Sequence, residues 1–130
     1  MGAVSGFRGP ITDYQISPNG KYLGVSSSTK DFRVYFLESV FEGKTQFFFK
    51  KCERHYPSAI SVTNKGKICV IAIEEENTLE FFKLYPKGKP NHNGKMEFLV
   101  SEKRFQKDLH KTTITKVRYN EEIDVAVTFA

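Results

Sequence analysis

Residues 11–36 read ITDYQIS-PNG-KYLGVSS-STKD-FRVYF, and this stretch decides the fold. Apolar and polar residues alternate in it, and β-branched and aromatic residues are frequent, which is typical of half-buried strands. Pro18-Asn19-Gly20 lies between the first two runs. These residues predict a tight turn, because proline presets φ and glycine tolerates a positive φ. Residues 28–31 separate the second run from the third. The stretch therefore predicts a three-stranded meander.

The same pattern returns twice further along the chain. Residues 59–62, 68–73 and 78–82 form a second set of three runs, and a third set begins at 113–119 and continues over 123–130. Gly20 and Gly66, the glycines of the first two turns, lie 46 residues apart, and the aromatic ends of the third runs, Tyr35 and Phe82, lie 47 apart. A period of about 40–50 residues with four strands per unit indicates the blades of a β-propeller.

The residues of the first unit also resemble a known family. Residues 16–23 (ISPNGKYL), followed by residues 31–35 (DFRVY), resemble the WD40 repeat, which has an SPDGK turn and then the pattern D-x-T-I-R-V-W-D. The chain departs from the pattern where Tyr35-Phe36 and Phe82-Lys83 stand in place of Trp-Asp, and it contains no tryptophan. The resemblance implies an all-β fold, a WD40-like β-propeller fragment built of four-stranded antiparallel blades.

The interpretation as a WD40-like propeller fragment divides the chain into four parts. Residues 1–10 form a lead-in, 11–52 blade one, 53–101 blade two, and 102–130 a linker with the first two strands of an incomplete third blade. We expect the fourth strands at 45–51 and 96–101, a loop over 38–44, and a charged connector with a short helical turn over 102–111. Because the sequence ends within a strand pattern, we expect a piece of a longer propeller whose open sheet edges favour self-association.

Composition narrows the setting of the protein. The 130 residues carry a net charge of +5, and the pI is near 9.2. No apolar run approaches 18 residues, so we expect no transmembrane segment, and the start lacks the pattern of a signal peptide. These features predict a cytoplasmic protein. The spacing of residues 77–84 (NTLEFFKL), a long charged linker and residues 110–114 (HKTTI) is similar to the transducin-β-like branch of the WD40 family. That similarity implies that the full-length parent associates with the cytosolic or membrane-associated face of the endoplasmic reticulum.

The sequence offers no catalytic constellation. It has no nucleophile elbow, phosphate-binding loop or zinc-protease motif. None of the three histidines, His55, His92 and His110, has a second ligand at a recognised spacing. We therefore expect no enzyme, no catalytic residue, no metal and no cofactor. Cys69 lies inside an apolar run and is expected to be a buried thiol, whereas Cys52 is expected to be exposed.

The first functional hypothesis is a non-catalytic scaffold for protein–protein interactions, because propellers present rigid loop faces to partners. Fold alone does not say which partner binds. Aromatic and basic loop residues dominate interface energetics. The candidates for partner binding are Arg8, Tyr56, Lys87, Lys89 and His92.

The alternative hypothesis is RNA binding through basic loop residues and adjacent aromatics. Phe47-Phe48-Phe49 precedes a basic run, and aromatic side chains beside lysines suit single-stranded nucleic acid. The alternative interpretation is that the interspersed lysines and glutamates only keep the loops solvated and bind no RNA. The candidates are Lys50, Lys51, Arg54, Lys103, Arg104 and Lys107.

Four residues are assigned structural roles by the WD40 resemblance. In that family a loop histidine hydrogen-bonds a hydroxyl on the second strand of a blade. His110 and Thr128 stand at those two positions in the third unit. Tyr35 and Phe82 stand at the position of the family's tryptophan on the third strand.

Overall fold

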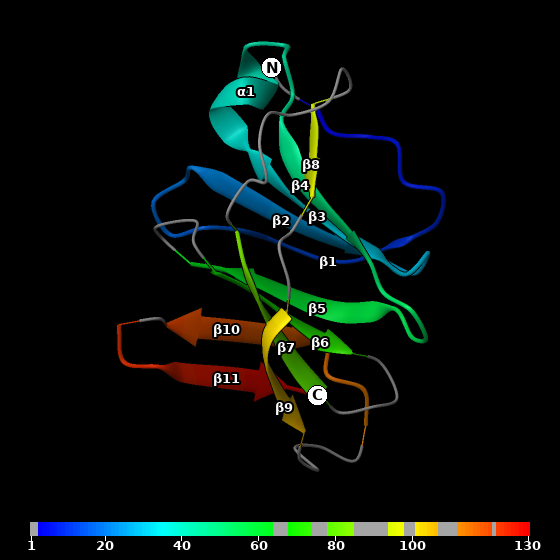
Figure 1. Cartoon of the computed structure of the whole chain (residues 1–130), viewed down its shortest axis with the longest axis vertical. Coiled ribbons are helices and arrows are strands. Elements are labelled where there is room, and N and C mark those ends of the chain that lie inside the picture. Colours follow the sequence, from blue (N-terminus) through cyan, green and yellow to red (C-terminus); the bar gives the residue numbers. More distant parts are fainter. Residues whose placement is uncertain are drawn as a thin grey trace.

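β-Strands are the main secondary structure of the described residues, and they form three sheets (Figure 1). The structure is a computed structural model, and it describes residues 3–63, 68–73, 78–84, 94–97, 101–106, 112–120 and 122–130. The prediction of an all-β fold is confirmed. Within these ranges one short helix, α1 (Leu37–Phe41), occupies the predicted loop over 38–44, and no helix is long and apolar enough to cross a membrane.

The first sheet has the strand order β1-β2-β3-β4-β8. Its first four strands pair antiparallel and match the predicted strands to within two residues; they are β1 (Ile11–Ile16), β2 (Tyr22–Ser27), β3 (Asp31–Phe36) and β4 (Phe47–Lys51). The short strand β8 (Lys95–Glu97) pairs with β4 in parallel. The Phe47 N–H donates to the carbonyl oxygen of Gly94 at 2.9 Å. Gly94 has a φ of +79°, and a Cβ there would overlap the carbonyl oxygen of Thr45, so glycine is required at this junction.

The second sheet has the order β5-β6-β7-β9, and the third pairs β10 with β11. Their bounds are β5 (Pro57–Val62), β6 (Ile68–Ile73), β7 (Thr78–Lys83), β9 (Ser101–Gln106), β10 (Lys116–Asn120) and β11 (Val125–Phe129). The prediction of a fourth strand at 96–101 is wrong, because 95–97 joins the first sheet and 101–106 takes the fourth place. The charged stretch 101–106 is a strand rather than part of a helical connector. Its register sets Arg104 opposite Glu80.

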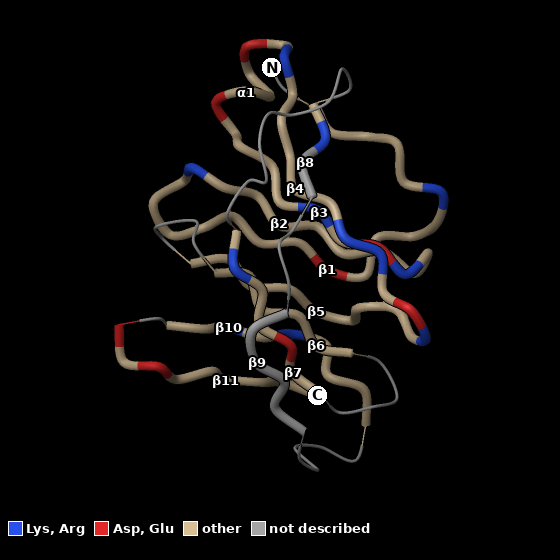
Figure 2. The backbone as a smooth tube through the Cα atoms, viewed as in Figure 1, with Lys and Arg blue, Asp and Glu red and all other residues tan. Residues whose placement is uncertain are grey.

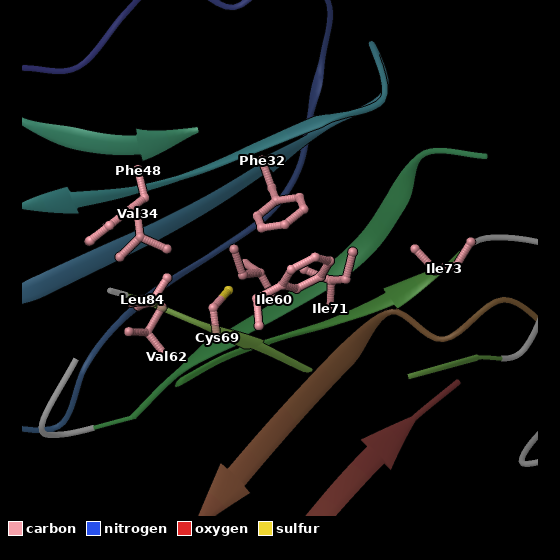
Figure 3. Packing of buried hydrophobic residues seen from close by; sticks show 10 residues of the cluster. Phe32, Val34, Phe48, Ile60, Val62, Cys69, Ile71, Ile73 and Leu84 are labelled. Carbon is pink, nitrogen blue, oxygen red and sulfur yellow. The ribbon is translucent and has the colours of Figure 1, made fainter. Parts of the chain in front are cut away.

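The second sheet lies between the other two, and its strands β5 and β6 are buried on both faces (Figure 1). A strand buried on both faces reads as a continuous apolar run, which explains the sequence ICVIAI of β6. Cys52, expected to be exposed, is half-buried against this core. The cluster between the first and second sheets (Figure 3) comprises Phe32, Val34, Phe48, Ile60, Val62, Cys69, Ile71, Ile73, Phe82 and Leu84. The cluster between the second and third sheets comprises Ala59, Val70, Ala72, Leu79, Ile114 and Val117.

The first two sheets repeat the same hairpin. In the first, the Ser17 N–H donates to the carbonyl oxygen of Tyr22 at 2.8 Å, and the Tyr22 N–H donates to the Ser17 hydroxyl at 3.1 Å. In the second, Thr63 and Ile68 make the same two hydrogen bonds at 3.1 and 3.3 Å. Thr63 follows Ser17 by 46 residues, which is the spacing of the turn glycines. The sequence repeat is therefore also a repeat of backbone geometry.

The sheets stack in the same orientation. A Cβ on Gly24 would lie 2.8 Å from Val62 of the second sheet, and Val70, the equivalent of Gly24, packs in the cluster toward the third sheet. Val25 lies in a cluster on the other face of the first sheet, and its equivalent, Ile71, packs toward the first sheet. Each of the first two sheets therefore presents equivalent positions to the sheet that follows it.

A side-chain hydrogen bond between the first strands of neighbouring sheets also recurs. The Gln15 side-chain oxygen on β1 accepts from the Val62 N–H on β5 at 3.1 Å. The Ser61 hydroxyl on β5 accepts from the Tyr119 N–H on β10, also at 3.1 Å. Ser61 follows Gln15 by 46 residues, so equivalent side chains make equivalent contacts at both junctions between sheets.

Asp13 connects the first strands of all three sheets. Its carboxylate is buried and accepts a hydrogen bond from the Ile60 N–H on β5 at 3.1 Å. It also lies 3.6 Å from the Lys116 ammonium group on β10. The first strands β1, β5 and β10 therefore lie together along one side of the stack.

Candidate functional site

A cavity of about 390 Å³ lies between the N-terminal segment and the strands β3, β4 and β8 on the first sheet. We call it the cationic cavity, because its lining carries four cationic side chains and one carboxylate. Lysine and arginine positions gather along these strands in Figure 2. The residues that line it are Gly6, Arg8, Thr29, Asp31, Arg33, Phe47, Phe49, Lys51 and Lys95.

Arg33 is the most constrained cation of the cavity, with a side chain only 14% exposed. Its guanidinium donates to the carbonyl oxygens of Ser5 at 3.3 Å and Gly6 at 3.1 Å, and to the hydroxyl of Tyr35 at 3.3 Å. Its Nε atom is buried and has no hydrogen-bond partner within the described residues. Burial raises the pKa of the Tyr35 hydroxyl above its usual range, and the hydrogen bond and charge of Arg33 partly offset that rise.

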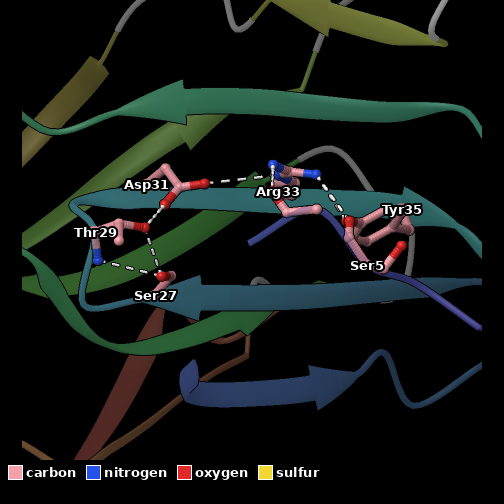
Figure 4. Close-up of polar contacts among 7 residues, drawn as sticks. Ser5, Ser27, Thr29, Asp31, Arg33 and Tyr35 are labelled. Atoms are coloured by element: carbon pink, nitrogen blue, oxygen red, sulfur yellow. Dashed lines mark hydrogen bonds and ion pairs between the residues drawn. The ribbon is translucent and has the colours of Figure 1, made fainter. Parts of the chain in front are cut away.

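Asp31, the acidic group of the cavity, is held by a short polar chain at the turn between β2 and β3 (Figure 4). The Thr29 hydroxyl donates to the Asp31 carboxylate at 2.6 Å, and the Thr29 and Ser27 hydroxyls lie 2.7 Å apart. The other carboxylate oxygen lies 3.7 Å from Arg33 Nε. Both oxygens of the Asp31 carboxylate therefore already contact groups of the protein, the Thr29 hydroxyl and the Arg33 guanidinium.

Two phenyl rings of the cavity lie against cations. The Arg33 guanidinium lies 5.1 Å from the Phe47 ring centroid and 5.6 Å from that of Phe49. It also lies 4.3 Å from the ring of Phe7 in the N-terminal segment, and the Lys95 ammonium group lies 4.1 Å from the Phe49 ring. Such cation–π contacts hold the positive charges in place.

Side chains alternate between the two faces of β4, so Lys50 and Lys51, which are neighbours in the sequence, lie on opposite faces. Phe47, Phe49 and Lys51 line the cavity, whereas Phe48 belongs to the core on the opposite face. Lys50 has the same parity as Phe48 and does not line the cavity. Both lysines are exposed, but strand geometry gives only Lys51 to this site.

The structure brings together only some of the predicted binding residues. Arg8 and Lys51 both line the cationic cavity. Tyr56 is half-buried and Arg54 exposed, both in the segment between β4 and β5 and outside the cavity lining. Lys103 and Arg104 belong to β9, where the backbone alone is described. Lys87, Lys89, His92 and Lys107 lie outside the described residues.

Of the residues given structural roles, Tyr35 and Phe82 are buried on the third strands of their sheets. The Phe82 ring packs against Phe32 across the first two sheets, with centroids 5.1 Å apart. Thr128 is half-buried on β11, and His110 lies outside the described residues. The hydrogen bond expected between His110 and Thr128 therefore stays a prediction.

Sequence reasoning missed Arg33, Asp31 and Lys95 as members of this site. Asp31 and Arg33 could have been found from the sequence, because residues at positions i and i+2 of a strand lie on the same face and opposite charges there can form an ion pair. Lys95 had no such signal, because the pairing of β8 with β4 joins residues nearly 50 positions apart.

A second hollow, of about 360 Å³, lies at the turn end of the first strands. We call it the turn groove. All three sheets contribute to it, through Gln15, Pro18, Val62, Thr63, Arg118, Tyr119, Asn120, Glu122, Ile123, Val125 and Val127.

The two hollows differ in chemistry. The cationic cavity can hold an anion, and the turn groove offers apolar surface to a protein segment. Across the described ranges, no group of three or more His, Cys, Asp or Glu side chains is placed to hold a metal ion. No model of a known protein family matches the chain, and no curated protein matches it.

Proposed function

We propose that the protein is a non-catalytic, WD40-like propeller scaffold that binds other proteins. The observation that carries this proposal is the recurring contact between first strands, Gln15 to the Val62 N–H and Ser61 to the Tyr119 N–H. Sheets that stack in one orientation through their first strands are the arrangement that a propeller needs. Resemblance to the transducin-β-like branch supports an extension of the proposal, in which the protein works at the cytosolic face of the endoplasmic reticulum.

The turn groove is the place where we expect a partner to bind. It is built from all three sheets, and sites built on strands hold their residues more precisely than sites on loops do. Ile123 lines it and is 67% exposed, so a change there alters the surface without opening the core.

Affinity capture of cell proteins with matched variants tests the scaffold function. Ile123→Asp should remove defined partners that the unchanged protein retains. Phe41→Asp is the control, because Phe41 is 69% exposed on α1 and does not line the groove. Capture of the same proteins by both variants at equal yield would count against the groove, and an empty capture with the unchanged protein would count against the scaffold function.

RNA binding is the second candidate, because the cationic cavity brings Arg8 and Lys51 together with Phe47 and Phe49. If the cavity neutralises RNA phosphates, affinity should fall steeply as salt rises, since bound counterions are released from the nucleic acid. Fluorescence anisotropy with a labelled single-stranded RNA at two salt concentrations measures that dependence. Affinity that does not change with salt would exclude this candidate.

A further inference from the structure

We propose that the cationic cavity binds a phosphate monoester group. This inference rests on the first sheet and the N-terminal segment, and it does not depend on the propeller or on the scaffold function. The chemistry of the ligand is a compact dianion, which can be free phosphate, a phosphorylated side chain or the headgroup of a phosphorylated lipid.

The cavity concentrates positive charge from distant parts of the chain. Arg8 comes from the N-terminal segment, Arg33 from β3, Lys51 from β4 and Lys95 from β8, against the single carboxylate of Asp31. Folding brings these like charges together around about 390 Å³ of open space. Such an arrangement creates a positive potential that a bound anion relieves.

Arg33 is preorganised for this role. The carbonyl oxygens of Ser5 and Gly6 and the Tyr35 hydroxyl fix its guanidinium. Its buried Nε has no hydrogen-bond partner within the described residues, although a buried N–H group is normally satisfied. A fixed guanidinium with donor capacity left suits the oxygens of a phosphate group.

The aromatic rings favour a compact anion over nucleic acid. Arg33 lies against Phe47 and Phe49, and Lys95 lies 4.1 Å from the ring centroid of Phe49. Phe47 also packs against the Tyr35 ring, with centroids 5.2 Å apart. Binding of single-stranded RNA uses aromatic faces for base stacking, but here cations and a neighbouring ring occupy the approach to those faces. The rings therefore position cations, and the cations bind the ligand.

Asp31 does not oppose such a ligand strongly. One of its carboxylate oxygens accepts from the Thr29 hydroxyl, and the other lies 3.7 Å from Arg33 Nε. Its negative charge is therefore already paired with donors on the protein, and the other three cations exceed it in number.

The test is a titration with inorganic phosphate at constant ionic strength, followed by amide chemical shifts of the ¹⁵N-labelled protein. We expect saturable shifts at Arg33, Phe49 and Lys51. Lys51→Ala and Arg8→Ala should each weaken binding about tenfold, which is the usual effect of losing one charge-assisted contact. Lys50→Ala is the matched control, because it removes the same charge one residue away on the opposite face, and it should leave affinity within about twofold.

Three further ligands distinguish the source of the phosphate group. A phosphoserine peptide or a soluble inositol phosphate that binds more tightly than inorganic phosphate identifies its own class, and equal affinities identify free phosphate as sufficient. Unphosphorylated peptide should not bind. The proposal is overturned if phosphate gives no saturable shifts, if Lys50→Ala weakens binding as much as Lys51→Ala, or if single-stranded RNA shifts these amides and phosphate does not compete with it.

Discussion

Replacing Asp13 by alanine tests how the three sheets are joined. The Asp13 carboxylate is buried, accepts from the Ile60 N–H at 3.1 Å, and lies 3.6 Å from the Lys116 ammonium group. Asp13→Ala leaves the buried N–H without an acceptor, which costs about 1–3 kcal/mol. The contact with Lys116 adds only about 0–1 kcal/mol, because the Lys116 side chain is 56% exposed and water screens the pair. The free energy of unfolding should therefore fall by about 1–4 kcal/mol.

Urea unfolding followed by circular dichroism measures this change, provided that the slope of the transition stays the same. Asp13→Asn separates the two contributions, because its amide oxygen still accepts from the Ile60 N–H while the charge is lost. It should cost less than about 1 kcal/mol. Glu53→Ala is the control, since Glu53 is an exposed carboxylate. A loss of less than about 0.5 kcal/mol for Asp13→Ala, which is the range of ordinary surface changes, would show that Asp13 does not stabilise the contact between the sheets.

Three further predictions concern packing and titration. Gly24→Val should lower the free energy of unfolding by about 1–3 kcal/mol through overpacking, because even a Cβ there lies 2.8 Å from Val62 and 3.0 Å from Ile60; thermal unfolding beside Lys50→Val, which places the same residue at an exposed position of β4, measures the difference. A thiol reagent at pH 8 should modify Cys52 before Cys69, because burial raises the pKa of the Cys69 thiol and the nearby Cys52 adds to the rise; mass spectrometry of the native protein would contradict this by finding Cys69 labelled first. The raised pKa of Tyr35 favours its neutral form in the folded state, so its contribution to stability is present below about pH 10 and is lost as the pH rises further. In urea unfolding, the free energy of unfolding of Tyr35→Phe should therefore fall less steeply with alkaline pH than that of the unchanged protein. An equal fall with pH in both proteins would exclude this cause.

The local structure of the first sheet could be predicted from the sequence. Alternation over 11–36 and the turn at Pro18-Asn19-Gly20 specify β1, β2 and β3, and the structure places all three within one residue of the prediction. The equivalent runs at 59–62, 68–73 and 78–82 became β5, β6 and β7, whose bounds lie within two residues of those runs. These elements depend on nearest neighbours in the chain, and local patterns carry that information.

The remaining errors arose where pairing joins distant residues. Residues 95–97 form a strand because the edge of β4 is available to them, and nothing within those residues identifies that partner. Residues 101–106 read as a charged connector, but pairing with β7 makes them a strand. The cationic cavity depends on the same long-range pairing, because Lys95 reaches it through β8. The basic run at Lys50 and Lys51 was visible in the sequence, and only the strand register assigns Lys51 to the cavity.

Amide hydrogen exchange of the native protein measures whether the three sheets stack through their first strands. The N–H groups of Ile60, Val62 and Tyr119 donate to side chains of the neighbouring sheet, so they should exchange as slowly as amides inside the sheets. Asp13→Ala should speed exchange at Ile60 and leave Val62 protected. Rapid exchange of all three amides in the folded, unchanged protein would contradict the stacked arrangement.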